Sequence, residues 1–244
     1  MRKVDKKSPL PLYYQLKEIL LEMIENEELI PGDMAPPERE LSEYHGISRM
    51  TVRKAIMDLV RAGILYREQG KGTYVAKPKP VHQLNQLLGF TEEMRGRGFD
   101  VQTKLLSFRR VPASRLLRKQ LQLEQQVAQV IELVRMRYVD DEPYALERVW
   151  LNGERFRKLE PAMIEENSLY DVLKEHYFAA PHWARQTIEP IQLNREEAKL
   201  FSMPIGTLAL LFCRTAYQAN DEVLEYTKCI YRADQHKYEV MLTV

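Results

Sequence analysis

The chain has 244 residues, with 36 Lys and Arg against 35 Asp and Glu, and 45% of its residues are apolar. This length is enough for two modest domains, each with its own core. No run approaches the roughly eighteen apolar residues of a membrane-spanning helix, and the first residues lack the apolar segment of a secretory signal, so we expect a cytoplasmic protein with no membrane partner.

Apolar periodicity in the first third of the chain predicts three helices. Apolar residues recur at intervals of three and four over residues 12–28, which is typical of an amphipathic helix. A second helix is expected from Pro36 to Gly46. The third begins after Ser48, a candidate N-cap, and ends at Gly63. The last two helices, joined by a Gly turn, have the pattern of a helix-turn-helix.

A glycine-rich hairpin is predicted directly after the third helix. Strands at 64–68 and 73–75 flank the turn Gly70-Lys71-Gly72. Glycine permits positive φ angles and lets the backbone approach another molecule closely. The helices and the hairpin together make a winged helix-turn-helix.

Positive charge gathers on the third helix and the hairpin. Residues 17–43 hold nine acidic against two basic residues, whereas residues 47–79 hold eight basic against two acidic residues. Helical spacing leaves Arg49 and Arg53 together on the outer face. Their like charges repel and destabilise the free protein, and an anionic partner would relieve that repulsion. A merely solvated basic face is the alternative. Because the charges coincide with the recognition-helix position, we predict binding to double-stranded DNA.

The stretch "PPERELSEYHGISRMTVRKAIMDLVRAGILYREQGKGTYV", within residues 9–78, resembles the winged helix-turn-helix of the GntR superfamily of bacterial transcription regulators. The resemblance implies base contacts in the major groove from Arg39 and Arg49 and phosphate contacts from Thr51 and Arg53. It also implies that the hairpin enters the minor groove. The expected DNA-binding residues are Arg39, Ser48, Arg49, Thr51, Arg53, Lys54, Gly70, Lys71, Gly72 and Thr73.

A change in composition marks the end of this domain. Residues 76–86, "AKPKPVHQLNQ", alternate Lys and Pro and then turn polar, which predicts an extended linker. We therefore place a DNA-binding domain at 1–78, a linker at 79–86 and a second domain at 87–244.

The second domain has the pattern of an α+β fold with a mainly antiparallel sheet. Hairpin turns are predicted at Asp140–Glu142 and Asn220-Asp221. Strands are expected at 101–111, 127–139, 143–152, 185–193, 207–218 and 223–233. Helices are expected at 91–97, 114–120, 154–165, 168–177 and 194–201.

One predicted strand carries two arginines on an otherwise apolar face. A period of two puts Arg135 and Arg137 on the same face as Ile131 and Leu133. Burying them without an acidic partner or an anionic ligand is costly, and Glu147 on the next strand is near enough to pair with one. These are either salt-bridged residues at a sheet edge or a clamp for a phosphate or carboxylate. The pattern alone favours neither.

Residues 84–240 are similar to the effector domain of the HutC subfamily, which has a chorismate-lyase-like fold. The similarity is carried by "LLGFTEEMRGRGF", "RMRYVDDEPYALER", "NSLYDVLKEHY", "RQTIEP" and "YTKCIYRAD", and is greatest to the N-acetylglucosamine-utilisation repressors, whose effectors are amino-sugar phosphates. It implies that Phe90, Thr91 and the two arginines hold a phosphate and that Glu147 accepts hydrogen bonds from the sugar. The implied effector site is Phe90, Thr91, Arg135, Arg137, Glu147, Ser168, Tyr170 and Tyr231.

These observations predict a homodimeric repressor that binds a pseudo-palindromic operator and is released by a small anionic effector, a phosphorylated sugar or amino sugar. Three alternatives stay open: a related regulator that answers an organic acid or phosphonate, a chorismate-lyase-like enzyme fused to a DNA-binding domain, and an architectural DNA binder. Because the sequence has no nucleophile elbow, metal-ligand spacing or cofactor fingerprint, we expect no catalytic residue, metal or cofactor.

Overall fold

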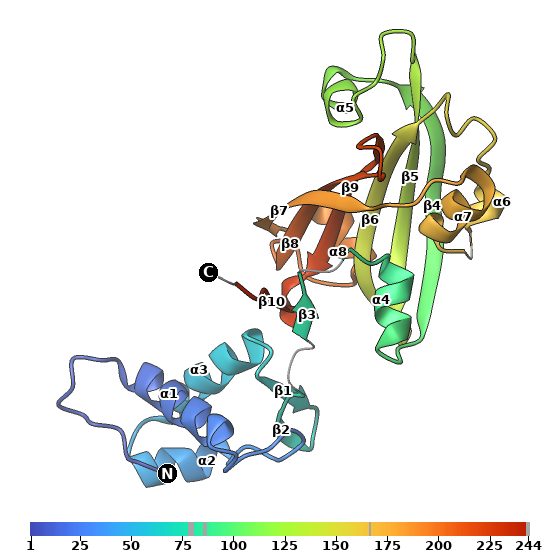
Figure 1. The fold of residues 1–244 in the computed structure, drawn as a ribbon. Helices are drawn as coiled ribbons and strands as arrows, with labels where there is room; N and C mark the ends of the chain where they lie inside the picture. Colours follow the sequence, from blue (N-terminus) through green and yellow to red (C-terminus); the bar gives the residue numbers. More distant parts are fainter. Residues whose placement is uncertain (78–80, 85–86, 166, 243–244) are drawn as a thin grey trace. The chain divides into compact units, whose positions relative to one another are not determined.

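The computed structural model describes residues 1–77, 81–84, 87–165 and 167–242, which form two compact units, Met1–Pro80 and Val81–Val244. Figure 1 labels the helices and strands of both units. Within the described residues, no helix is long and apolar enough to cross a membrane.

The first unit is a winged helix-turn-helix. Its core is built from α1, the buried side of α3 and the two strands of the hairpin, with Leu16, Val52, Ile56 and Leu59 almost completely buried. The two strands pair antiparallel, as predicted. The elements are α1 (Leu12–Glu25), α2 (Glu38–His45), α3 (Arg49–Arg61), β1 (Leu65–Glu68) and β2 (Gly72–Val75).

Local chemistry sets the ends of these helices. Ser48 caps α3 by accepting a hydrogen bond from the Thr51 backbone N–H at 3.1 Å, as predicted. Gly46 ends α2 in the left-handed conformation, with φ at 63°. The first helix stops at Glu25, earlier than the prediction of residue 28, and the chain turns at Glu27, whose φ is 59°.

The second unit is built on a six-stranded antiparallel sheet in the order β4-β5-β6-β9-β8-β7. The β5–β6 hairpin turns at Asp140 and Asp141, both with positive φ, at the predicted position. The strands are β3 (Val81–Gln83), β4 (Val101–Pro112), β5 (Gln129–Val139), β6 (Glu142–Asn152), β7 (Trp183–Gln192), β8 (Leu208–Tyr217), β9 (Val223–Arg232) and β10 (Lys237–Glu239).

Helices cover both faces of this sheet (Figure 1). On one face, α4, α6 and α7 pack over apolar residues of β5 and β6. On the other face, α5 and α8 cover two smaller apolar clusters. The helices are α4 (Phe90–Gly96), α5 (Arg115–Gln120), α6 (Pro161–Ile164), α7 (Leu169–Tyr177) and α8 (Arg195–Leu200), with a 3-10 turn, η1, at Ala233–Gln235.

The prediction of a helix over 154–165 was wrong for its first half. The Asn152 side chain accepts hydrogen bonds from the backbone N–H groups of Glu154 and Arg155, which holds a turn there. The helix begins only at Pro161, whose fixed φ suits a first turn.

Part of the predicted linker is a strand of the second unit. Val81–Gln83 form β3 and pair in parallel with β10. Leu84 follows the strand and donates a backbone hydrogen bond to Glu239, and the predicted linker positions 79–80 and 85–86 lie outside the described residues.

Candidate functional site

The first turns of α3 present a cationic surface. Arg49 and Arg53 are exposed, and within the described part of the chain neither forms an ion pair. Met50, between them, is 72% exposed. Sequence reasoning missed this residue, although an apolar side chain out of phase with the buried stripe of α3 was the signal. An exposed thioether beside two guanidiniums suits contact with a thymine methyl group.

The hairpin and α2 hold the other cationic groups of this surface. Gly70 and Gly72 have positive φ, which lets the turn fold back with the Lys71 side chain 72% exposed. Lys71 Nζ lies 2.9 Å from a carboxylate oxygen of Glu68, and Arg39 Nε lies 3.5 Å from one of Glu43. Exposed pairs of this kind contribute little to stability, so both cations can change partner at low cost.

Three more of the predicted DNA-binding residues, Ser48, Thr51 and Lys54, have internal partners. The Thr51 hydroxyl lies 2.8 Å from that of Ser48. Lys54 Nζ lies 3.6 Å from the centre of the Tyr13 ring on α1, which is a close cation–π contact. The DNA contacts expected of Lys54 and of the other residues of this set stay predictions.

In the second unit, all eight predicted effector residues line one pocket between α4, α7 and the sheet. The pocket has a volume of about 630 Å³, including the solvent at its mouth. The residues come from α4, β5, β6, α7 and β9, so only the tertiary fold brings them together. They are Phe90, Thr91, Arg135, Arg137, Glu147, Ser168, Tyr170 and Tyr231.

Arg135 and Glu147 form an ion pair, as one interpretation of the sequence predicted, but the predicted place at a sheet edge was wrong because β5 and β6 are interior strands. They are direct neighbours in the β5–β6 register, and Arg135 Nε donates to Glu147 Oε2 at 2.8 Å. Arg135 is only 3% exposed, and its Nη1 group has no hydrogen-bond partner among the described residues. The pair therefore leaves one buried donor unused.

Arg137 lies deeper and has no carboxylate partner among the residues that the structure describes. Its Nη2 donates to Thr91 Oγ1 at 2.6 Å, and its guanidinium stacks 4.5 Å from the centre of the Phe90 ring. Its Nε is buried and lacks a partner within the same described ranges. Burial, with a further effect from Arg135, lowers the pKa of Arg137 to about 10.

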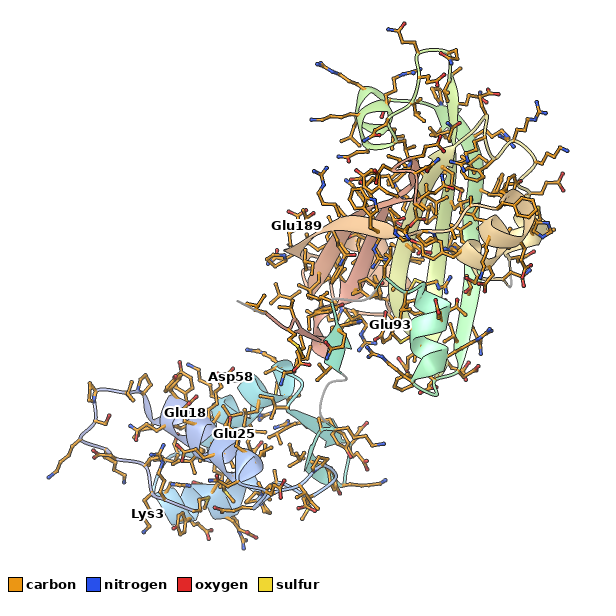
Figure 2. The ribbon with its side chains drawn as sticks, viewed as in Figure 1. Lys3, Glu18, Glu25, Asp58, Glu93 and Glu189 are labelled. Atoms are coloured by element: carbon orange, nitrogen blue, oxygen red, sulfur yellow. The ribbon has the colours of Figure 1, made fainter. Side chains whose placement is uncertain are left out.

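Other polar side chains line the pocket beside the predicted residues, and of these sequence reasoning missed Arg214. Arg214 on β8 donates to Gln186 at 2.8 Å, and the Tyr170 hydroxyl donates to Glu225 at 2.6 Å. Arg214 lies in the apolar run "LALLFCRTAY", the same signal that singled out Arg135. Glu93 of α4 also lines the pocket (Figure 2) and pairs with Arg97 at 2.9 Å.

The electrostatics of the pocket favour an anion. Burial raises the pKa of Glu147, but Arg135 and Arg137 outweigh this effect and hold that pKa below its usual value. Burial raises the pKa of Glu225, and Glu147 adds to the rise. Three arginines line the pocket, Arg135 and Arg137 buried and Arg214 half-buried. Of its three carboxyl groups, Glu93 pairs with Arg97 and Glu225 resists ionisation, which leaves Glu147 as the main counter-charge. An anion would complete both the charge and the hydrogen bonds.

Known families match both units. A family model described as "Bacterial regulatory proteins, gntR family" matches residues 12–75, and the UTRA domain model matches residues 96–237. The HTH-type transcriptional repressor NagR of Bacillus subtilis is 35% identical over 96% of both chains. The chain belongs to the GntR family.

Other GntR-family members are similar over nearly the whole length. The mannosyl-D-glycerate transport/metabolism system repressor MngR of Escherichia coli is 32% identical over 95% of both chains. The crystal structure of PhnF from Mycobacterium smegmatis has a TM-score of 0.66 at 25% identity, covering 95% of this chain and 99% of that one. This GntR-family chain is therefore a ligand-responsive transcription regulator and not an enzyme, which excludes the fused-enzyme alternative.

Proposed function

We propose that this regulator is a cytoplasmic, homodimeric repressor whose effector is a phosphorylated sugar or amino sugar. The winged unit, proposed as residues 1–78, binds one half of a pseudo-palindromic operator in each subunit. The domain proposed at 87–244 holds the effector, and Val81–Gln83 of the predicted linker belong to the same unit. Two relatives support this assignment by their names: NagR is described as a transcriptional repressor, and MngR as the repressor of a mannosyl-D-glycerate transport and metabolism system.

The observation that carries the effector proposal is the pair of buried donors without partners, Arg135 Nη1 and Arg137 Nε. Both belong to cations that line one pocket, and an unsatisfied buried donor costs about 1–3 kcal/mol, more when it is charged. A phosphate has enough acceptor oxygens to satisfy both guanidiniums at once. Ser168, Tyr170 and Tyr231 line the same pocket, and their hydroxyl oxygens are the groups proposed to contact a sugar ring.

Regulation follows from thermodynamic linkage. If the effector favours a dimer in which the two α3 helices no longer match the half-sites, the operator weakens effector binding by the same factor. A useful coupling is about 1–3 kcal/mol, which is a 5- to 150-fold change in affinity.

A thermal-shift panel tests the effector class. It compares glucose 6-phosphate, glucosamine 6-phosphate and N-acetylglucosamine 6-phosphate with the unphosphorylated sugars, organic acids and phosphonates. Saturable stabilisation is expected with the phosphate esters and not with the free sugars. Stabilisation by an organic acid or a phosphonate alone would replace the sugar proposal with the alternative regulator.

A further inference from the structure

The first seven residues of the chain form a basic arm, residues 1–7, that none of the predicted DNA contacts includes. The arm has four cations, Arg2, Lys3, Lys6 and Lys7, against one acid, Asp5. It precedes α1, and its backbone is held against the helices of the first unit at specific points.

One buried side chain and several hydrogen bonds anchor the arm. Val4 is 8% exposed and belongs to the apolar core of the unit. Its backbone N–H donates to Nδ1 of His45, the last residue of α2, at 3.3 Å. Two more bonds tie the arm down: Asp5 N–H donates to the Gln15 side chain at 2.8 Å, and the Tyr44 hydroxyl donates to the Met1 carbonyl at 2.6 Å.

This anchoring brings Lys6 to the turn of the helix-turn-helix. The Lys6 ammonium lies 3.1 Å from the position that a Cβ on Gly46 would occupy. Gly46 is two residues before Ser48, the N-cap of α3, so the ammonium lies close to the helix end that also holds Arg49. In a helix-turn-helix the first residues of the second helix enter the major groove while the preceding helix crosses the phosphate backbone.

The other cations of the arm differ in their surroundings. Arg2 pairs with Glu22 of α1 at 2.8 Å, and Lys3 lies 5.2 Å from the centre of the Tyr44 ring on α2 (Figure 2). Lys6 and Lys7 are exposed, and no carboxylate within the described residues pairs with either. Arg2 is therefore engaged on α1, whereas Lys6 is available beside the recognition helix.

We propose that the arm is an additional DNA-binding element in which Lys6 contacts a backbone phosphate next to the α2–α3 turn. The proposal rests on the DNA-binding function of the winged unit. Lysine at this place also interacts favourably with the carbonyl end of α2, whether or not DNA is present. That purely structural role predicts a loss of folding stability without a change in the salt dependence of DNA binding.

The test is the salt dependence of operator binding by the full chain. Each protein cation that neutralises a phosphate contributes about 0.9 to the slope of log K against log salt concentration. Lys6→Ala is expected to lower the magnitude of that slope by about 0.9 for each subunit bound. Between 50 and 200 mM salt, this makes the loss of affinity about three- to fourfold smaller for each contact removed.

Two further variants make the result decisive. Arg2→Ala removes one charge from the same arm but not from the turn, so its slope is expected to equal that of the wild type. Val4→Gly keeps every lysine and loosens the anchor, so it is expected to lose part of the slope that Lys6→Ala loses. Thermal unfolding of each variant establishes that the winged unit stays folded.

The outcomes separate this proposal from the function on which it rests. A wild-type slope in Lys6→Ala, with binding intact, overturns the arm contact and leaves the regulator function in place. Equal slope losses in Lys6→Ala and Arg2→Ala assign the effect to net charge and also overturn the contact. Absence of salt-dependent duplex binding by the wild type would instead contradict the DNA-binding function.

Discussion

Arg135 and Arg137 lie two residues apart on one strand, yet their replacement by Met is expected to change stability in opposite directions. For Arg137, burial lowers the pKa from 12.5 to about 10, with Arg135 adding to the effect. That shift corresponds to about 3 kcal/mol against the charged form. The hydrogen bond to Thr91 and the contact with Phe90 each offset about 1 kcal/mol. Arg137→Met should therefore stabilise the unliganded unit by about 1 kcal/mol, or roughly 2–4 °C in Tm.

Arg135→Met has the opposite expectation because Arg135 compensates a carboxylate. Its side chain is 4% exposed, that of Glu147 is 15% exposed, and removal of the arginine leaves the carboxylate largely buried without its partner. Breaking such a pair costs about 3–5 kcal/mol. Its Tm should fall by roughly 10 °C, at 2–4 °C for each kcal/mol in a unit of this size.

Differential scanning calorimetry of the full chain in phosphate-free buffer measures both effects, and a repeat with saturating glucosamine 6-phosphate measures the ligand response. Both variants should lose the ligand-induced rise in Tm. If Arg137→Met destabilises the protein as much as Arg135→Met does, the Arg137 cation is well compensated in the unliganded state. In that case the argument for an anionic ligand fails.

Three further outcomes follow from the structure. The pKa of Glu147 is lowered in the folded state, so its contribution to stability is present above its unfolded-state pKa near 4.5 and is lost as the pH falls. Glu147→Gln should therefore flatten the dependence of stability on pH in that range. An unchanged pH dependence in acid denaturation would contradict the ion pair. Ser48→Ala should cost about 1 kcal/mol through loss of the α3 cap, measured by thermal unfolding, and Ser48→Thr serves as the control that keeps a capping hydroxyl. Arg49→Ala should cost about 1–3 kcal/mol of operator affinity and relax base preference. Lys71→Ala should chiefly lower the dependence of operator affinity on salt concentration. Identical behaviour of the two variants in binding-site selection would refute the division between base and phosphate contacts.

Periodicity was enough to predict most of the fold. The stripe of Val52, Ile56 and Leu59 fixed which face of α3 is buried, and a period of two placed Arg135 and Arg137 on one face of β5. The Asp140–Asp141 turn set the β5–β6 register that puts Glu147 beside Arg135. These features depend on neighbours along the chain or across one hairpin.

Features that depend on distant packing escaped the sequence patterns. Phe90, Thr91, Ser168 and Tyr170 lie on α4 or at the start of α7, and only family resemblance placed them beside the β5 arginines. Arg214 carries the same local signal as Arg135, an arginine within an apolar strand, but its partner Gln186 lies on β7, whose pairing with β8 the local pattern does not fix.

Two further predictions failed for reasons that residue propensity does not register, one local and one long-range. The first half of the helix predicted at 154–165 does not form, because the Asn152 side chain accepts hydrogen bonds from two backbone N–H groups and holds a turn there. The Lys-Pro stretch suggested an extended tether, but three residues directly after it, Val81–Gln83, pair with β10 from the far end of the chain.

The affinity of the full-length protein for its selected operator, titrated with and without a saturating sugar phosphate, tests the central claim most directly. The account predicts that the phosphate ester changes operator affinity by about 5- to 150-fold, and that the operator changes effector affinity by the same factor. An operator affinity that stays the same, although calorimetry shows the ester bound, would contradict it.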